Sequence, residues 1–223
     1  DKYSHFINYT KKDGICNNEI NDIIQDHEGF MWFATEEGVS RFDGYTFVNF
    51  YYEANNRSSL PGNIVTSLAI DNAHNLWIGT TEGLCKLNQN SGQFERYMAH
   101  TNSAKTPRTD NIRELHFSSE NNTLWIETLD GTLTSFNQNN NEWNHYIHEV
   151  STQPFYRYHT LYEDNAGYLW VGGRNTPIMQ FSPVNKSFYS IQATGEEQGG
   201  KRDNDLADII QTRNNEWFVV GLD

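Results

Sequence analysis

Cysteine, basic residues and long apolar runs are scarce in this 223-residue sequence, and each scarcity excludes a class of protein. Two cysteines, Cys16 and Cys85, provide neither a disulfide framework nor a metal-binding motif. Sixteen Lys and Arg against 29 Asp and Glu give a net charge of −13, which argues against nucleic acid as a partner. No apolar stretch reaches the roughly 18 residues of a membrane helix, so we expect no direct membrane insertion in this segment.

A sustained 3.6-residue apolar period is also missing, so the sequence does not predict helical repeats. The chain shows no signal-peptide pattern and begins with Asp1 instead of Met, as a processed or trimmed start would. No His, Cys or acidic cluster has metal-ligand spacing, and we expect neither a metal nor a cofactor.

What the sequence does contain is a tryptophan that returns about every 46 residues, a period typical of repeat proteins. The copies are Trp32, Trp77, Trp125, Trp170 and Trp217. Before each Trp stand two apolar residues three apart and an Asn- or Gly-rich turn. After it come a further turn in most units, an alternating segment and, in the complete units, a closing aromatic or apolar pair. Four short β segments per unit match one propeller blade, although the WD40 and kelch signatures are absent.

The pattern therefore predicts an all-β fold, a β-propeller of four-stranded antiparallel blades with about four and a half blades present. The predicted parts are a closing strand at 4–10, blades at 20–52, 63–99, 110–148 and 156–193, and the start of a fifth blade at 204–223. Since an incomplete ring leaves sheet edges open, we expect the chain to be part of a larger, seven-bladed ring. A five-bladed ring closed by Phe6–Tyr9 is the alternative.

The polar residue before each Asn- or Gly-rich turn is the first candidate for chemistry. It is Asp26, Asp71 and Asp164 in three units, and Ser118 and Thr212 in the other two. Recurrence once per blade favours a structural role, in which the side chain accepts backbone N–H groups of the turn. The Trp that follows is expected to pack between blades, with its N–H on a local acceptor.

The block from Asn21 to Gly44, with its Asp-x-x-Gly-x-x-Trp core, resembles the two-component-regulator propeller repeat, and Asp71–Leu87 is a second similar copy. That family occupies the periplasmic sensor region of hybrid two-component systems in glycan-degrading gut bacteria. The resemblance implies a non-enzymatic, extracytoplasmic sensor that binds or relays an oligosaccharide signal to regulate glycan-utilisation genes. It also implies that kinase, receiver and DNA-binding parts lie elsewhere on the parent chain. As partners we expect the remainder of that chain and a second copy in a homodimer.

Ligand contacts are expected where the repeat varies, at the two residues between the apolar anchors of each first strand. Sugar recognition needs planar hydrogen-bonding groups beside an aromatic platform, and the third and fourth units supply both. The candidates are Arg113, Glu114, Tyr156, Arg157, Tyr158, His159 and Arg174. Against this stands the plainer interpretation that channel residues only solvate the pore, since pockets are few per protein.

Two other functions stay open from the sequence. A propeller enzyme, such as a lyase or glycoside hydrolase, predicts a convergent acid/base pair with shifted pKa values in one cleft. A protein-docking propeller predicts an exposed apolar patch instead. The sensor predicts hydrogen-bonding and aromatic groups without an acid/base pair.

Overall fold

The computed structural model describes residues 6–88, 91–99, 106–147, 159–173, 178–191 and 206–221. Over these residues the protein is all-β apart from one short 3-10 helix, η1 (Lys11–Asp13). The strands form four four-stranded sheets and one two-stranded sheet, and every pairing between consecutive strands is antiparallel. No helix in these ranges is long and apolar enough to cross a membrane.

Each sheet is built from strands that are consecutive in the sequence. The first contains β1 (Ile20–Gln25), β2 (Met31–Thr35), β3 (Gly38–Phe42) and β4 (Phe47–Phe50). The second contains β5 (Val65–Ile70), β6 (Leu76–Thr80), β7 (Gly83–Asn88) and β8 (Gln93–Tyr97), and the third β9 (Ile112–Ser118), β10 (Thr123–Thr128), β11 (Thr132–Asn137) and β12 (Glu142–Ile147). The fourth contains β13 (His159–Glu163), β14 (Leu169–Gly173), β15 (Met179–Ser182) and β16 (Ser187–Ser190), and the last β17 (Leu206–Gln211) and β18 (Trp217–Gly221).

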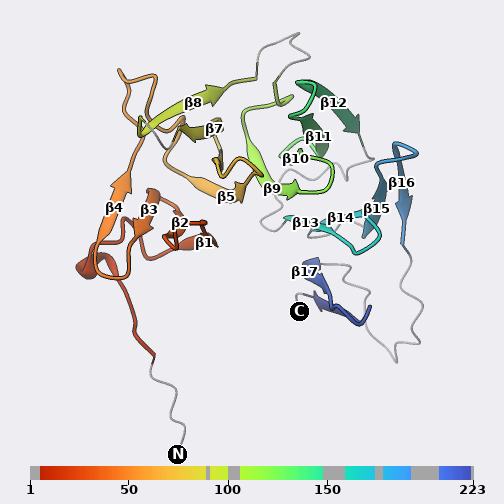
Figure 1. Cartoon of the computed structure of the whole chain (residues 1–223), viewed down its shortest axis with the longest axis horizontal. Helices are drawn as coiled ribbons and strands as arrows, with labels where there is room; N and C mark the ends of the chain where they lie inside the picture. Colours follow the sequence, from red (N-terminus) through yellow and green to blue (C-terminus); the bar gives the residue numbers. More distant parts are fainter. Residues whose placement is uncertain are drawn as a thin grey trace, which may run out of the picture.

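The five sheets are arranged around a common centre (Figure 1). The first strand of each sheet, from β1 through β5, β9 and β13 to β17, lies innermost, and the fourth strands lie outside. The arc is open between β17 and β1. The predicted fold class is confirmed: four complete blades and the start of a fifth form a partial β-propeller. The seven-bladed ring stays a prediction.

The N-terminal segment is not paired in this structure: the described residues 6–10 form no strand. In the five-bladed alternative its partner would be a third strand in the sheet of β17 and β18, and that sheet has two strands in the described residues. The closing strand at 4–10 stays a prediction. Tyr9 packs on the first blade, with ring centroids 4.9 Å from Phe42 and 5.7 Å from Phe47.

The core lies between neighbouring blades. Three apolar clusters are each shared by two consecutive sheets: Leu68 and Ile78 of the second blade pack with Trp32 of the first, for example. Trp77 joins the next cluster, between the second and third blades, and is 1% exposed. This packing between blades is what the recurring Trp predicts. Cys16 and Cys85 are both buried and free.

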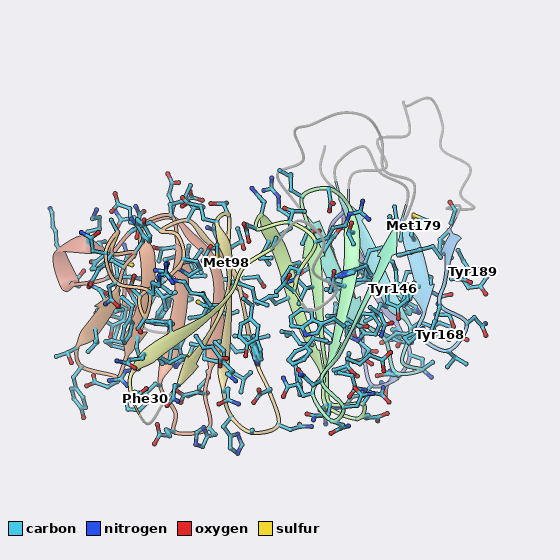
Figure 2. The ribbon with its side chains drawn as sticks, turned by 90° about the horizontal axis from the view of Figure 1, so that it is seen from above. Phe30, Met98, Tyr146, Tyr168, Met179 and Tyr189 are labelled. Carbon is cyan, nitrogen blue, oxygen red and sulfur yellow. The ribbon has the colours of Figure 1, made fainter. Side chains whose placement is uncertain are left out.

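The turn before each second strand has the predicted chemistry. Asp26 Oδ1 accepts the backbone N–H of Glu28 and Phe30, and Oδ2 accepts Nε1–H of Trp32 at 2.7 Å. Asp71 and Asp164 repeat these contacts. Figure 2 shows that Phe30 and Tyr168, which end two of these turns, lie towards one face of the ring, while Met98 and Met179 lie towards the other.

The two substituted turns behave differently from each other. The hydroxyl of Thr212 accepts the N–H groups of Asn214 and Glu216, as expected for a weaker substitute for Asp. The hydroxyl of Ser118 instead donates to Glu163 Oε1 of the next blade at 2.8 Å. The prediction is therefore confirmed for Thr212 and wrong for Ser118, because a carboxylate of the neighbouring blade is within reach as a stronger acceptor.

Two glycines in the first blade allow the cost of backbone strain to be compared with the cost of a steric clash. Gly38 and Gly44 both have positive φ, +122° and +96°. A Cβ at Gly38 would meet the carbonyl oxygen of Phe50, whereas nothing lies within 4 Å of one at Gly44. We expect Gly44→Ala to cost about 1 kcal/mol and Gly38→Ala roughly 2 kcal/mol or more, measured by urea unfolding. Equal costs would show that the contact with Phe50 is relieved without penalty.

Candidate functional site

A cavity of about 720 Å³ is lined by residues of the inner strands and of the turns beside them. The first strands of all five sheets contribute to it. Its lining residues are Glu19, Ile20, Asn21, Asp22, Glu36, Ile64, Thr66, Thr81, Arg113, Glu114, Thr160, Leu161, Tyr162 and Asp208. Five carboxylic acids and one guanidinium are among them, so the described lining is polar and acidic.

A bulge at the start of the inner strands presents the residues between the apolar anchors to this cavity. The pairing register shifts at Asn21 in β1, at Thr66 in β5 and at Arg113 in β9. A bulge leaves one residue outside the ladder and turns its side chain away from the regular alternation. Of the predicted variable pairs, Asn21, Asp22, Thr66, Arg113, Glu114, Thr160 and Asp208 line the cavity.

The first two bulge residues have a structural role. Asn21 Nδ2 donates to the carbonyl of Val65 at 2.7 Å, and Thr66 Oγ1 donates to the carbonyl of Ile112 at 3.1 Å. Both acceptors are the first residue of the next inner strand. These bonds link each blade to its successor, which agrees with the plainer interpretation of the channel residues at these two positions.

Arg113 occupies the same bulge position in the third blade and lacks such a bond. Its Nε is buried and has no hydrogen-bond partner. Burial lowers the pKa of the guanidinium, and the nearby Glu127 opposes that effect. A guanidinium keeps its charge in proteins, so Arg113 holds an unsatisfied, partly desolvated donor beside the cavity. An oxygen acceptor of a bound molecule would satisfy it.

In the first three blades, the second residues of the variable pairs form a chain of contacts from blade to blade. Asp22 Oδ2 accepts the N–H of Leu68 at 2.7 Å and lies 3.3 Å from the hydroxyl of Ser67. The same hydroxyl lies 2.9 Å from Glu114 Oε1. Side chains of three different blades therefore meet along the inner wall.

The carboxyl groups at the two ends of this chain have perturbed acidity. Burial raises the pKa of Glu114 well above its usual value, and repulsion from Asp22 adds to the effect. Burial also raises the pKa of Asp22, while the N–H groups of Leu68 and Ile23 oppose the rise. Such shifts concentrate at functional sites, although structural networks cause them too.

The structure describes part of the predicted site. Arg113 and Glu114 lie in the cavity wall as expected. His159 begins β13, but its side chain lies outside the described residues, as do Tyr156, Arg157, Tyr158 and Arg174. Asp22, Glu36, Thr81, Tyr162 and Asp208 also line the cavity and were not among the predicted site residues. Asp22 and Asp208 stand in the variable pairs, and Glu36 and Thr81 both stand four residues after a repeat Trp, so the repeat pattern does carry a signal for them.

Metal ligation has no candidate in the part of the chain that the structure describes. No group of three or more His, Cys, Asp or Glu is arranged there to hold an ion. His27 and His74 do stack at one face, with ring centroids 4.1 Å apart, but they form a pair without a third ligand.

Comparison with known families identifies the repeat itself. The family described as two component regulator propeller matches residues 14–37, 59–82 and 152–175. Three stretches of the chain therefore match two-component-regulator propeller repeats. The first two matches each cover an inner strand, the Asp turn and the Trp strand of one blade.

Proteins similar to this repeat chain are much longer. A curated relative, histidine kinase P4 of Formosa agariphila, is 31% identical over 90 residues, which are 39% of this chain and 6% of that protein. The extracellular domain of a hybrid two component system from B. thetaiotaomicron has a TM-score of 0.79 at 23% identity, covering 96% of this chain and 29% of that one. Virginiamycin B lyase from Staphylococcus aureus has a TM-score of 0.65 at 10% identity, covering 91% and 63%. The structural likenesses establish the propeller fold, and the chain spans less than a third of the first two proteins.

Proposed function

We propose that this propeller is the extracytoplasmic, periplasmic sensor module of a hybrid two-component histidine kinase/response regulator. The observation that carries the proposal is the polar cavity lined by the inner strands, with an unsatisfied Arg113 donor in its wall, in a chain that matches two-component-regulator repeats. The segment itself is not an enzyme in this proposal, and kinase activity lies in another part of the parent chain. The solved structure of an extracellular domain from a hybrid two component system, with the same fold, supports this placement.

The ligand of this cavity is proposed to be an oligosaccharide whose presence regulates glycan-utilisation genes. A volume of about 720 Å³ suits a small saccharide, since ligand pockets typically measure about 300–1,000 Å³. Arg113 supplies a donor, Glu114 and Asp208 supply carboxyl groups, and Tyr162 supplies an aromatic ring. Hydroxyl groups of a sugar can both donate to and accept from such a set.

Transmission of the signal would use the bonds between blades. A ligand shifts an equilibrium only by its differential affinity for two arrangements of the protein. Asn21 and Thr66 in the cavity wall, and Ser67 next to them, connect neighbouring inner strands. A ligand that favours one spacing of these strands therefore favours one packing of the propeller against its partners. Those partners are proposed to be the remainder of the parent chain and a second copy in a homodimer.

A propeller lyase or glycoside hydrolase is the second candidate, because Asp22 and Glu114 are two carboxyl groups with raised pKa values in one cavity. That is the acid/base signature an enzyme requires. Asp22, however, is bonded to the backbone N–H groups of Leu68 and Ile23. These bonds give it a structural function that explains its position without catalysis.

Titration calorimetry against plant, host and microbial oligosaccharides tests the proposal, with turnover followed by chromatography. We expect saturable binding of one glycan without turnover. Arg113→Met should then weaken binding roughly 10- to 100-fold, the usual loss for a charged hydrogen-bond donor. Arg108→Met is the matched control, because Arg108 is half exposed and pairs with Asp130 at 3.5 Å.

Each other outcome contradicts the proposal in its own way. Conversion of a glycan to products would establish the enzyme. Equal affinities of the Arg113 and Arg108 variants would place the ligand outside this cavity. No binding across the panel would favour a docking propeller or a sensor that detects glycans through a separate binding protein.

A further inference from the structure

Ser67 is a fully buried hydroxyl with too few protons for its contacts. It accepts the backbone N–H of Leu115 at 3.1 Å, which occupies one of its two lone pairs. It also lies within hydrogen-bond distance of Asp22 Oδ2 and Glu114 Oε1, at 3.3 and 2.9 Å. A hydroxyl has a single proton, so it can donate to one carboxyl group and not to both.

With both carboxyl groups ionised, one contact would set a lone pair of Ser67 against a negatively charged oxygen. A proton on either carboxyl group removes this conflict, because the acid then donates to Ser67 while Ser67 donates to the other carboxylate. The arrangement fits three groups from three blades that share one additional proton. Contact between like charges across a buried hydroxyl would otherwise be costly.

The other charges around Glu114 also favour its protonated form. Glu127 of β10 pairs directly opposite Glu114 in the ladder, and it is 2% exposed. The corresponding residues of the other blades are Ala34, Gly79, Gly172 and Val220. Like charges at directly opposed positions are destabilising, and only the third blade has this pair.

The described groups that face Glu114 come from four strands. Asp22 approaches from β1 and Glu127 from β10, Asp208 of β17 lines the same cavity, and Arg113 is on the same strand as Glu114. Strand β5 contributes Ser67 and has no titratable residue. On β13, Glu163 is the one acidic residue and is bonded to His116 and Ser118, and Tyr162 lines the cavity. One guanidinium therefore stands among several carboxyl groups.

We propose that Glu114 holds a proton at neutral pH and shares it through Ser67 with Asp22, forming a proton-dependent link between the first three blades at the channel wall. Loss of this proton at higher pH opposes the close approach of the three inner strands. The device belongs to the chain itself and needs no ligand. Only its consequence for signalling, that ligand affinity in the cavity depends on pH, rests on the proposed sensor function.

The pKa shifts of Glu114 and Asp22 are in the direction that the geometry requires. The pKa of Glu114 is raised well above 4.5, and that of Asp22 is raised as well, both mainly by burial. Below pH 4.5 the folded and unfolded states both hold the proton, and the stabilisation from this link is complete. It is lost as the pH rises through the folded-state pKa of Glu114.

The experiment compares the protein with Glu114→Gln, which keeps the shape and cannot ionise. Urea unfolding is measured across the pH range from 4 to 9. At pH values between the unfolded and folded pKa of Glu114, folding of the parent should take up about one more proton than folding of Glu114→Gln. The unfolding free energy of the parent should therefore fall with pH more steeply. Glu142→Gln is the control: this side chain is exposed on the outer strand β12 and its removal should leave the slope unchanged.

Infrared difference spectra give a second measure that does not depend on unfolding. At neutral pH the parent should show the carbonyl stretch of a buried protonated carboxyl group, absent in Glu114→Gln and present in Glu142→Gln. If Glu114→Gln does not fold, Asp22→Asn provides the same comparison, with the band shifted because Ser67 loses one carboxylate partner. A parent without this band at neutral pH, or with the same pH slope as Glu114→Gln, overturns the proposal. Neither result depends on whether any glycan binds.

Discussion

Replacing Trp77 with alanine is expected to lower the free energy of unfolding by about 3–5 kcal/mol. Trp77 is 1% exposed, and its ring lies 5.1 Å from Tyr97 and 5.8 Å from Phe136, between the second and third blades. Alanine would leave a cavity there that neighbours on two rigid sheets cannot fill. Because single domains are stable by about 5–15 kcal/mol, this loss is a large share of the total.

The repeat provides a matched control for this prediction. Trp217 occupies the same repeat position but is 38% exposed, in the two-stranded sheet, where it contacts Trp170 and Tyr162. Trp217→Ala should cost about 1–2 kcal/mol, since less apolar surface is buried. Urea unfolding with tryptophan fluorescence measures both. Similar losses for the two variants would mean that the Trp acts through its own strand and not through packing between blades.

The second large effect is expected for Asp71→Ala, at roughly 3 kcal/mol. The Asp71 carboxylate is 3% exposed and accepts hydrogen bonds from Trp77 Nε1 at 2.9 Å and from the backbone N–H groups of Ala73 and Asn75. Alanine removes the acceptor and leaves the buried donors without a partner. An unsatisfied buried donor costs about 1–3 kcal/mol, and these losses are not additive.

Asp164→Ala tests whether burial determines that cost. Asp164 makes the same three contacts, with Trp170 Nε1 at 2.8 Å, in a more exposed turn. Water can replace the carboxylate there, so we expect a loss of about 1 kcal/mol. Hydrogen exchange of the turn amides measures how far each substitution weakens the turn itself. A larger loss at Asp164 than at Asp71 would contradict the explanation.

Much of the fold follows from local chemistry that one repeat unit contains. The Asp turn, the Trp strand and the glycines at positive φ are decided by residues within a few positions of each other, as Asp26 and Trp32 show. The position of Arg113 and Glu114 in the channel follows from the same pattern, since it places each variable pair on an inner strand. Tyr156, Arg157, Tyr158 and Arg174 lie outside the described residues, so their role in binding stays a prediction.

The sequence alone determined the repeat: its period, its four strands, its turn chemistry and the strand that lines the channel. Only the tertiary structure decided which blades meet through which side chains. Ser67 bonds Glu114, and Ser118 turns from its own backbone to Glu163, across separations of about 46 residues that no local pattern encodes. The physical reason is that these contacts depend on the distance between separate sheets, which is set by the packing of the Trp layers around the ring.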